Sequence, residues 1–415
     1  MSESFRCRGH SAIAGTHGKT LELTRDHQVT RRATCVLGVD SDHDNGALLA
    51  LRGIVEVTLQ CGSLTDTFEA TVTPFFLGDD SLVFRRGPAL RGRTFAYDST
   101  KTAAEIDRDL VRALTNPNAV LDVTVRELGR GERRGVLFVV AVPIGNDDDL
   151  SPRARRVLEA ADVVLAEDTR RFRDLAHRAG LQPRGSVVSY HDQNEAARSD
   201  DAVASMADGA RVALVSDAGT PLFSDPGYVV VNRALDAGFE VTPVPGPSSL
   251  LAVLSASGLP IDRFAYVGFL PRRSAARQAE LRRLTDRRET FVLHEAPHRV
   301  GALLADLAVV CPDWRVCAGR EVTKVFEEFR RGTARELALD LANEEARGEF
   351  SLVVAPPAGA AKAVDAGADA QLDRLVRALL AQGVTTKTLA HALADLPGVS
   401  RKEAYARVLA IADEE

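Results

Sequence analysis

The stretch Arg211-Val212-Ala213-Leu214-Val215-Ser216-Asp217-Ala218-Gly219-Thr220-Pro221 joins a short apolar run to a turn of small and polar residues. The apolar run Val241–Val244 is followed by a similar turn that extends to Ser249. Each turn is expected at the carboxyl end of a strand, which is the edge where open α/β sheets bind ligands. Glycine lets the backbone approach a ligand closely. The two turns therefore predict a cradle for a polar small molecule.

Further apolar runs indicate the fold class. The continuous run Val136–Val142 is typical of a strand buried on both faces of a sheet. Ser151 and Pro152 then suit the N-cap and first turn of a helix. Helical patterns alternate with more strand candidates, which predicts an α/β architecture with largely parallel sheets. These candidates are Val163–Ala166, Val212–Val215, Val241–Val244, Phe291–Leu293 and Ser351–Ala355.

The two ends of the chain show different patterns of apolar and polar residues. Residues 1–134 are predicted to be mainly β, because Val55–Cys61 and Phe68–Val72 alternate apolar and polar residues around a turn. Helical spacing at 102–115 adds one helix, and the polar run Gly129–Gly135 is typical of a linker. Pro356–Gly367 is expected to be a second linker, before about three short helices of helix-turn-helix type. The predicted domains are 1–134, 135–250, 251–358 and 366–415.

Composition excludes several classes of protein. No apolar run in the 415 residues approaches the ~18–20 residues of a membrane helix. The five scattered cysteines contain no CxxC pair, which favours reduced thiols in a cytoplasmic protein. The net charge of −6 gives no global attraction to nucleic acid. Arg272–Arg288, however, holds seven arginines against only Glu280 and Asp286.

Some motifs carry candidate chemistry, and each also has a plain structural interpretation. Val142-Pro143-Ile144-Gly145-Asn146 is a strand-to-helix turn without the GxGxxG pattern of dinucleotide sites, and a P-loop is also absent. Ala166-Glu167-Asp168-Thr169-Arg170 is a dense polar cluster or a solvated loop with an internal ion pair. Lys324, among carboxylates in Arg320–Glu328, is a proton acceptor if its pKa is lowered, and otherwise an ion-paired lysine.

His294-Glu295-Ala296-Pro297-His298 formally matches the zinc-protease pattern HExxH. That chemistry needs both histidines on one face of one helix. Pro297 falls inside the required helix, where it removes a hydrogen bond and costs about 3 kcal/mol. We therefore expect a strand-end loop that lines a pocket, and no metal site.

Taken in order, these motifs resemble the ribosomal RNA small-subunit methyltransferase I family, class III enzymes of the tetrapyrrole-methylase superfamily. The resemblance runs from Phe138 to about Pro357 and includes Ser189-Tyr190-His191, Ala256-Ser257-Gly258-Leu259-Pro260 and Gly348-Glu349-Phe350. It implies S-adenosylmethionine as cofactor and 2′-O-methylation of a cytidine in the decoding centre of 16S ribosomal RNA. It also implies a homodimer acting on the 30S particle, with two α/β subdomains and the cofactor in the cleft between them.

The chemistry of methyl transfer suggests candidates for the base, and the resemblance implies the cofactor contacts. Lys324 and Glu167 are the candidates for the base, with Glu295 as a further rival, and no metal is required. Arg272–Arg288 is expected to contact RNA phosphates, or else to be an exposed helix face. Cofactor contacts are expected from Pro143, Asp217, Ala218, Gly219, Thr220, Pro245, Gly246, Ser248, Ser249 and Glu295.

Two features leave alternatives open. His294 stands where the family usually has an aromatic residue. The residues before 135 resemble a small uncharacterised domain family best known from archaea, which supplies no function. The alternatives are methylation of a tetrapyrrole or protein by the same superfamily, and an S-adenosylmethionine-sensing RNA-binding protein without catalysis.

Overall fold

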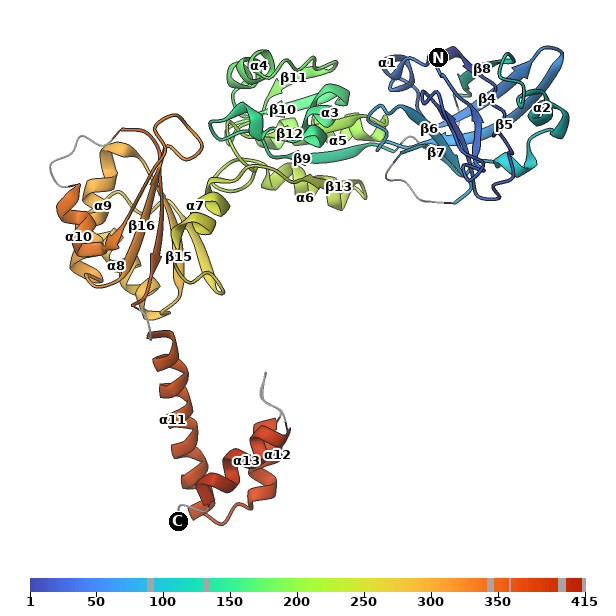
Figure 1. Ribbon diagram of the computed structural model, residues 1–415. Helices are drawn as coiled ribbons and strands as arrows, with labels where there is room; N and C mark the ends of the chain where they lie inside the picture. Colours follow the sequence, from blue (N-terminus) through green and yellow to red (C-terminus); the bar gives the residue numbers. More distant parts are fainter. Residues whose placement is uncertain are drawn as a thin grey trace. The chain divides into compact units, whose positions relative to one another are not determined.

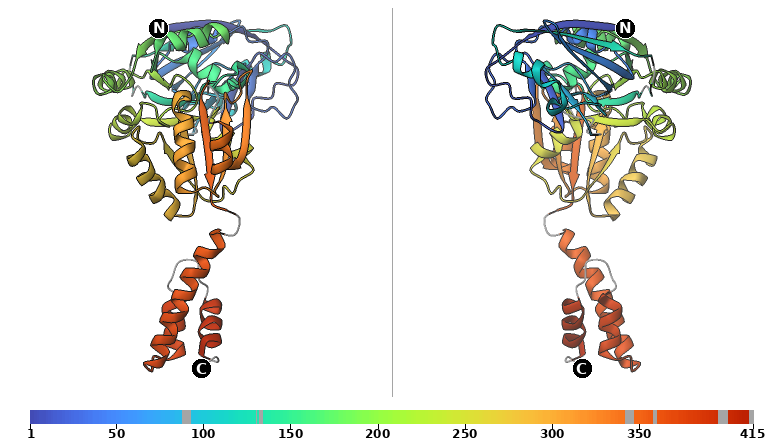
Figure 2. Two further views of the ribbon diagram at one scale, coloured as in Figure 1. Left: turned by 90° about the vertical axis from the view of Figure 1, so that its left-hand side faces the viewer. Right: turned by 90° about the vertical axis from the view of Figure 1, so that its right-hand side faces the viewer.

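A computed structural model describes residues 1–87, 93–129, 131, 134–341, 347–357, 360–394 and 401–412, with backbone alone for 360–370 (Figures 1 and 2). The chain divides into two compact units, Met1–Ser249 and Leu250–Glu415. Unit 1 contains the N-terminal β domain and the first α/β subdomain. Unit 2 contains the second α/β subdomain and the C-terminal helices. The finer division into four domains stays a prediction.

The N-terminal domain is built on one eight-stranded sheet of order β1-β8-β4-β5-β7-β6-β2-β3. The expected hairpin is present, with Gly62 at a φ of 61° in its turn. The predicted helix at 102–115 is instead a 3-10 turn and a shorter helix, because Asp107 caps the helix by accepting from the backbone N–H groups of Asp109 and Leu110. The strands are β1 (Ser2–Arg8), β2 (Thr20–Thr24), β3 (Val36–Gly38), β4 (Ile54–Cys61), β5 (Leu64–Val72), β6 (Ser81–Arg85), β7 (Thr94–Tyr97) and β8 (Val120–Glu127), and the helices are α1 (Asn45–Leu48), η1 (Ala103–Glu105) and α2 (Arg108–Ala113).

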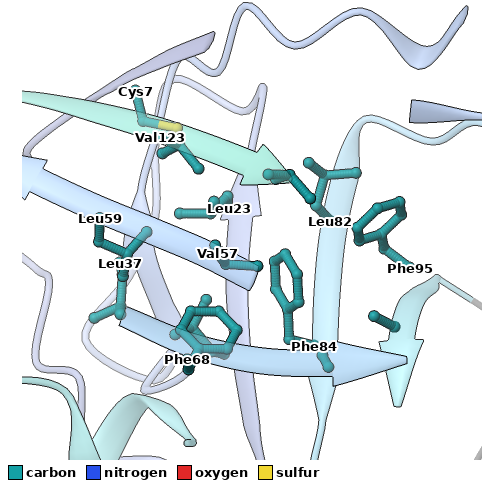
Figure 3. Close-up of a cluster of buried hydrophobic side chains, with 14 of the residues drawn as sticks. Cys7, Leu23, Leu37, Val57, Leu59, Phe68, Leu82, Phe84, Phe95 and Val123 are labelled. Atoms are coloured by element: carbon teal, nitrogen blue, oxygen red, sulfur yellow. The ribbon is translucent and has the colours of Figure 1, made fainter. Parts of the chain in front are cut away.

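This sheet closes on itself. Arg8 and Val39 exchange backbone hydrogen bonds of 2.7 and 2.9 Å, which joins the first strand to the chain just beyond β3. Inward-facing side chains such as Cys7, Leu23, Val57 and Phe84 fill the interior (Figure 3). Eight strands leave an interior that side chains can fill. The centre of the domain is therefore a packed core.

The first α/β subdomain is wholly parallel, as predicted. Its strands lie in the order β11-β10-β12-β9-β13. Ser151 accepts from the N–H of Ala154 and caps the first helix, which Pro152 begins. The strands are β9 (Val136–Val140), β10 (Val163–Ala166), β11 (Ser186–Ser189), β12 (Arg211–Val215) and β13 (Glu240–Val244), and the helices are η2 (Asp147–Asp149), α3 (Pro152–Ala160), α4 (Thr169–Arg178), α5 (Glu195–Ala207) and α6 (Tyr228–Asp236).

Helices cover both faces of this sheet (Figure 1). Phe138 and Val164 pack with α3 and α4, whereas their neighbours Leu137 and Leu165 pack with α5 and α6. Successive side chains of a strand point to opposite faces, so both faces must be apolar. This explains why the strands of this sheet are continuous apolar runs in the sequence.

The second α/β sheet corrects the expectation of largely parallel strands. Its order is β14-β15-β18-β16-β17, and only the pair β14–β15 is parallel. The short connection between β16 and β17 allows only antiparallel pairing. The strands are β14 (Phe264–Gly268), β15 (Thr290–Glu295), β16 (Arg315–Arg320), β17 (Glu328–Thr333) and β18 (Phe350–Ala355), and the helices are α7 (Ser249–Ser257), α8 (Ser274–Asp286), α9 (Pro297–Val310) and α10 (Ala334–Asp340).

The C-terminal helices are α11 (Ala360–Ala381), α12 (Thr386–Ala394) and α13 (Arg401–Ala412). Their buried cluster, which includes Val376, Leu389 and Val408, draws only on these three helices within the described residues. The linker predicted at Pro356–Gly367 is too long, because α11 already begins at Ala360. Residues 395–400, with the predicted start of the last helix at Ser400, lie outside the described residues.

None of the described helices combines the length and the apolar character needed to cross a membrane.

Candidate active site

The predicted cradle lies at the carboxyl edge of the first α/β sheet. The chain leaves β9, β10, β12 and β13 at this edge, and β9 lies between β12 and β13 in the sheet. Consecutive strands β9 and β10 are separated by β12, so the strand order changes direction here. Such a switch point opens a crevice outside the strand ends.

Hydrogen bonds join the loops that follow β9, β12 and β13. Val142 donates to the carbonyl of Gly219 at 2.9 Å, and Gly219 donates back to Val142 at 3.0 Å. Thr220 Oγ1 donates to the carbonyl of Pro247 at 3.0 Å. The structure therefore brings the predicted segments around Pro143, Asp217–Thr220 and Pro245–Ser249 to one edge of one unit.

Two glycines let the loops of this edge pack closely. Gly219 has a φ of 81°, and a Cβ there would lie 3.3 Å from Ile144. A Cβ on Gly246 would lie 3.0 Å from Ala141 Cβ. Glycine tolerates both the positive φ and the close approach. The loops that follow β12 and β13 can therefore lie directly against the loop that follows β9.

Asp217 and Asp168 hold the loops rather than point free into the edge. Asp217 accepts from the N–H of Asp168 at 3.0 Å and pairs with Arg171 at 3.2 Å, which ties the β12 loop to the β10 loop. Asp168 caps α4 by accepting from the N–H of Arg170 at 2.8 Å, and it also binds the Arg170 guanidinium. The internal ion pair of the alternative interpretation is therefore present in this loop.

Glu167 and Asp225 are the unusual carboxyls of the edge. Glu167 Oε2 is buried without a hydrogen-bond partner among the described residues. Burial, and then the nearby charge of Asp217, raise the pKa of Glu167 above its usual value. Burial, and then the charge of Glu167, raise the pKa of Asp225 to about 7. Asp225 therefore exchanges its proton near neutral pH, and the raised pKa of Glu167 makes it a stronger base than a free glutamate, which suits acid–base chemistry.

Asp225 is not among the residues that the sequence analysis assigns to the site. Its motif, Ser224-Asp225-Pro226-Gly227, is visible in the sequence, but the burial of the carboxyl is not. Leu222 and Ser224 adopt positive φ angles of 76° and 67°, which are uncommon for residues other than glycine. This constrained loop returns Asp225 toward Ser216 and Glu167, with which it interacts.

Glu295 lies in unit 2, at the end of β15. Its side chain is fully buried, and Oε1 accepts from the N–H of Ala296 at 2.9 Å and lies 3.1 Å from Arg299 Nε. Oε2 has no partner among the described residues. A buried carboxylate oxygen without a donor is costly, so this atom is a candidate acceptor for a ligand.

The HExxH match is divided between two elements. His294 lies on β15, where it bonds to Ser351 Oγ at 2.8 Å, and His298 lies in α9, which begins at Pro297. Burial lowers the pKa of His294. The two histidines therefore do not share the helix face that a zinc protease requires. The described part of the chain contains no cluster of three or more metal-ligating side chains.

Lys324 is an ion-paired lysine. Its Nζ lies 3.0 Å from Glu321 Oε1 and 3.2 Å from Glu349 Oε2. Burial lowers the pKa of Lys324, but the two carboxylates outweigh burial and the net pKa is raised. A base needs the opposite shift. This geometry favours the plain structural interpretation of Lys324.

Arg277 does not belong with the phosphate-binding arginines expected at Arg272–Arg288. It is buried, and its Nε donates to Asp306 Oδ2 at 2.7 Å. Six arginines of the stretch are exposed: Arg272, Arg273, Arg282, Arg283, Arg287 and Arg288. The expected RNA-facing surface is limited to these six.

Residues 136–338 match the Tetrapyrrole (Corrin/Porphyrin) Methylases, and residues 5–127 match a domain of unknown function, DUF371. Ribosomal RNA small subunit methyltransferase I of Xylella fastidiosa (strain Temecula1) is 40% identical over 65% of this chain and 98% of its own length. The enzyme of that name from Micromonospora olivasterospora is 41% identical over 66% of this chain and 86% of its own length. This chain belongs to the ribosomal RNA small subunit methyltransferase I family.

As a member of this family, the chain is an S-adenosylmethionine-dependent methyltransferase. Solved structures of other enzymes also match it. Uroporphyrin-III-C-methyltransferase from Thermus thermophilus has a TM-score of 0.38 and 25% identity over 53% of this chain and 94% of its own. Diphthine synthase has a TM-score of 0.42 and 15% identity over 54% of this chain and 90% of its own. The assignment to the family rests on the sequence relatives.

The residues of the carboxyl edge fit the cofactor of this methyltransferase family. S-adenosylmethionine carries hydroxyls, an ammonium and a sulfonium, which need acceptors and negative charge. Gly246 is exposed, so a ligand can approach the backbone of the loop after β13 closely. The partly exposed carboxylate of Asp217 places negative charge at the same edge.

Proposed function

We propose that this enzyme transfers a methyl group to the ribose 2′-oxygen of a cytidine in the decoding centre of 16S ribosomal RNA. The family relationship to named ribosomal RNA methyltransferases carries the proposal. We infer further that the substrate is the 30S particle, that the enzyme acts in the cytoplasm and that it is a homodimer.

The chain's own residues would hold the cofactor at the carboxyl edge of the first sheet. Pro143, Gly219 and Gly246 would shape the backbone around it, and Asp217 would fix the β10 and β12 loops. The other proposed cofactor residues are Ala218, Thr220, Pro245, Ser248 and Ser249, with Glu295 from the second subdomain. When bound, S-adenosylmethionine supplies the methyl group on a sulfonium, so the protein needs no metal.

We propose Glu167 as the base that accepts the proton of the 2′-hydroxyl. Its partly buried carboxylate has a raised pKa and one oxygen without a hydrogen-bond partner among the described residues. Positioning of the ribose oxygen supplies much of the rate in such a displacement. Lys324, held by Glu321 and Glu349, would instead stabilise the loop between β16 and β17.

The substrate is tested with labelled S-adenosylmethionine, 30S particles that lack the modification, and mass spectrometry of the digested RNA. We expect the label as 2′-O-methylcytidine at one position. Label on a base would contradict the proposed reaction. Label on protein or an added tetrapyrrole alone would favour the superfamily alternative. Measurable cofactor binding without any transfer would favour the non-catalytic sensor.

Glu167→Gln tests the base. Because general base catalysis typically contributes 10²–10⁴-fold, we expect turnover to fall by about that factor while cofactor affinity by calorimetry stays within about twofold. Asp168→Asn is the matched control, since asparagine also caps a helix. Lys324→Ala should leave the pH profile of methylation unchanged. Near-normal turnover of Glu167→Gln, or an altered profile in Lys324→Ala, would reverse the assignment.

A further inference from the structure

A fully buried arginine lies where the N-terminal domain meets the first α/β subdomain. Arg211, the first residue of β12, is only 1% exposed. Its Nε donates to the carbonyl of Pro74 at 3.0 Å, and its Nη1 donates to the carbonyl of Leu49 at 3.0 Å. Both carbonyls belong to the N-terminal domain. One side chain of the α/β subdomain therefore holds two separate loops of that domain.

Asp162 completes this contact from the residue before β10. It accepts from the N–H of Arg211 at 2.7 Å, and both of its oxygens lie 2.8 Å from Arg52 Nη2 of the N-terminal domain. Burial, and then the charge of Arg52, lower the pKa of Arg211 to about 9, while Asp162 acts in the opposite direction. Arg211 therefore remains charged at neutral pH and needs its buried acceptors.

Apolar side chains cross the same boundary. The rings of Phe75 and Phe138 meet edge to face, with centroids 6.1 Å apart. Leu77 packs on the core of the α/β subdomain, and Ala160 of α3 belongs to the core cluster of the N-terminal domain. Interfaces between mobile domains are usually more polar. This boundary resembles a continuous interior instead.

The boundary lies far from the cofactor edge. Arg211 and Asp162 are at the amino ends of β12 and β10, whereas the cofactor loops follow the carboxyl ends. A five-residue strand is about 16 Å long. The N-terminal domain therefore docks at the opposite edge of the sheet from the candidate active site.

We propose that the N-terminal domain is a permanently docked partner of the cofactor subdomain, clamped at the amino edge of the sheet by Arg211 and Asp162. The occupant of this surface is the chain's own N-terminal domain, and the docking does not depend on the proposed reaction. The relatives align over about two thirds of this chain, and the match to the uncharacterised domain lies outside the methylase match. The clamp thus serves a domain that the methylase match does not include.

Cutting the connection in the full chain tests the docking. A protease recognition sequence is inserted between Leu128 and Arg134, the purified protein is cleaved, and association of the fragments is followed by size-exclusion chromatography and native mass spectrometry. We expect the two fragments to stay together at micromolar concentration. In Arg211→Met, association should weaken at least about 100-fold, because two buried carbonyls lose their donor.

Arg277→Met is the matched control. It removes another buried arginine, which pairs with Asp306 in unit 2, and should leave the fragments associated as in the parent. If Arg211→Met does not give a folded chain, Asp162→Asn and Phe75→Ala are used in the same measurement. The proposal is overturned if the parent fragments separate at micromolar concentration. It also fails if the variants at the boundary associate as tightly as the parent.

Discussion

Asp225 is held among other acidic groups in the loop after β12. Burial raises its pKa most, the charges of Glu167 and Asp217 raise it further, and a hydrogen bond with Ser216 lowers it. Because the pKa of about 7 exceeds the value of 3.8 for a free aspartate, the native state binds this proton more tightly than the unfolded chain does. The free energy of unfolding is therefore highest at low pH, where Asp225 is protonated. It falls as the pH rises from about 4 to 7 and the buried carboxyl ionises.

Asp225→Asn should relieve this loss. We expect the variant to melt close to the parent at pH 4 and several degrees above it at pH 8, because the amide never ionises. Thermal unfolding across that range measures the difference. Asp201→Asn, at an exposed position of α5, is the control and should show no such trend. A difference between Asp225→Asn and the parent that stays constant with pH would refute the explanation.

The sequence predicts which loops form the site better than it predicts how individual carboxyls behave. Gly219 and Gly246 mark close approaches that follow from short motifs after apolar runs. The raised pKa of Asp225 depends on burial, which comes from packing between segments far apart in the chain. The ion pair of Lys324 with Glu349 likewise joins residues 25 positions apart. Such neighbours cannot be located by spacing along one segment.

At the scale of elements, α8 presents the exposed arginines proposed to meet RNA. Arg282 and Arg283 are exposed on this helix, whereas Arg277 faces the buried Asp306. The hydrophobic residues Leu281 and Leu284 anchor the helix to the second sheet. The helix therefore separates a packed face from a charged face.

Reversing two of these charges tests the surface. Arg282→Glu with Arg283→Glu should weaken binding to 30S particles at least tenfold and reduce the slope of log K against log salt by about 1.5–2, as lost phosphate contacts require. Cofactor affinity should not change. The control pair, Arg32→Glu with Arg112→Glu, lies on exposed sites of the N-terminal domain. An equal loss in both pairs would indicate a general effect of net charge.

The two α/β sheets differ in how far sequence patterns predict them. The first sheet is recognised because strands buried on both faces are continuous apolar runs. In the second, β16 begins and ends with arginine, and β17 contains Arg330 and Arg331. These strands resemble loops in the sequence. Their antiparallel pairing makes the second sheet mixed, which alternation of helices and strands alone does not indicate.

At the scale of the whole molecule, the C-terminal bundle has a core of its own. The buried residues of α11–α13 contact one another in a single cluster, whose members all lie after residue 370 in the described chain.

A chain that ends at Pro357 should therefore keep its main melting transition within about 2 °C and bind the cofactor as before. Calorimetry and thermal unfolding measure both. Loss of cofactor affinity would show that the bundle contributes to the site.

The closed N-terminal sheet has a consequence for how copies of this enzyme can meet. An open sheet exposes backbone donors and acceptors at its rim, and another chain can add a strand there. The mutual bonds of Arg8 and Val39 occupy that rim. The domain therefore resists edge-to-edge aggregation, and a dimer of this protein must use side-chain surfaces rather than strand addition at this seam.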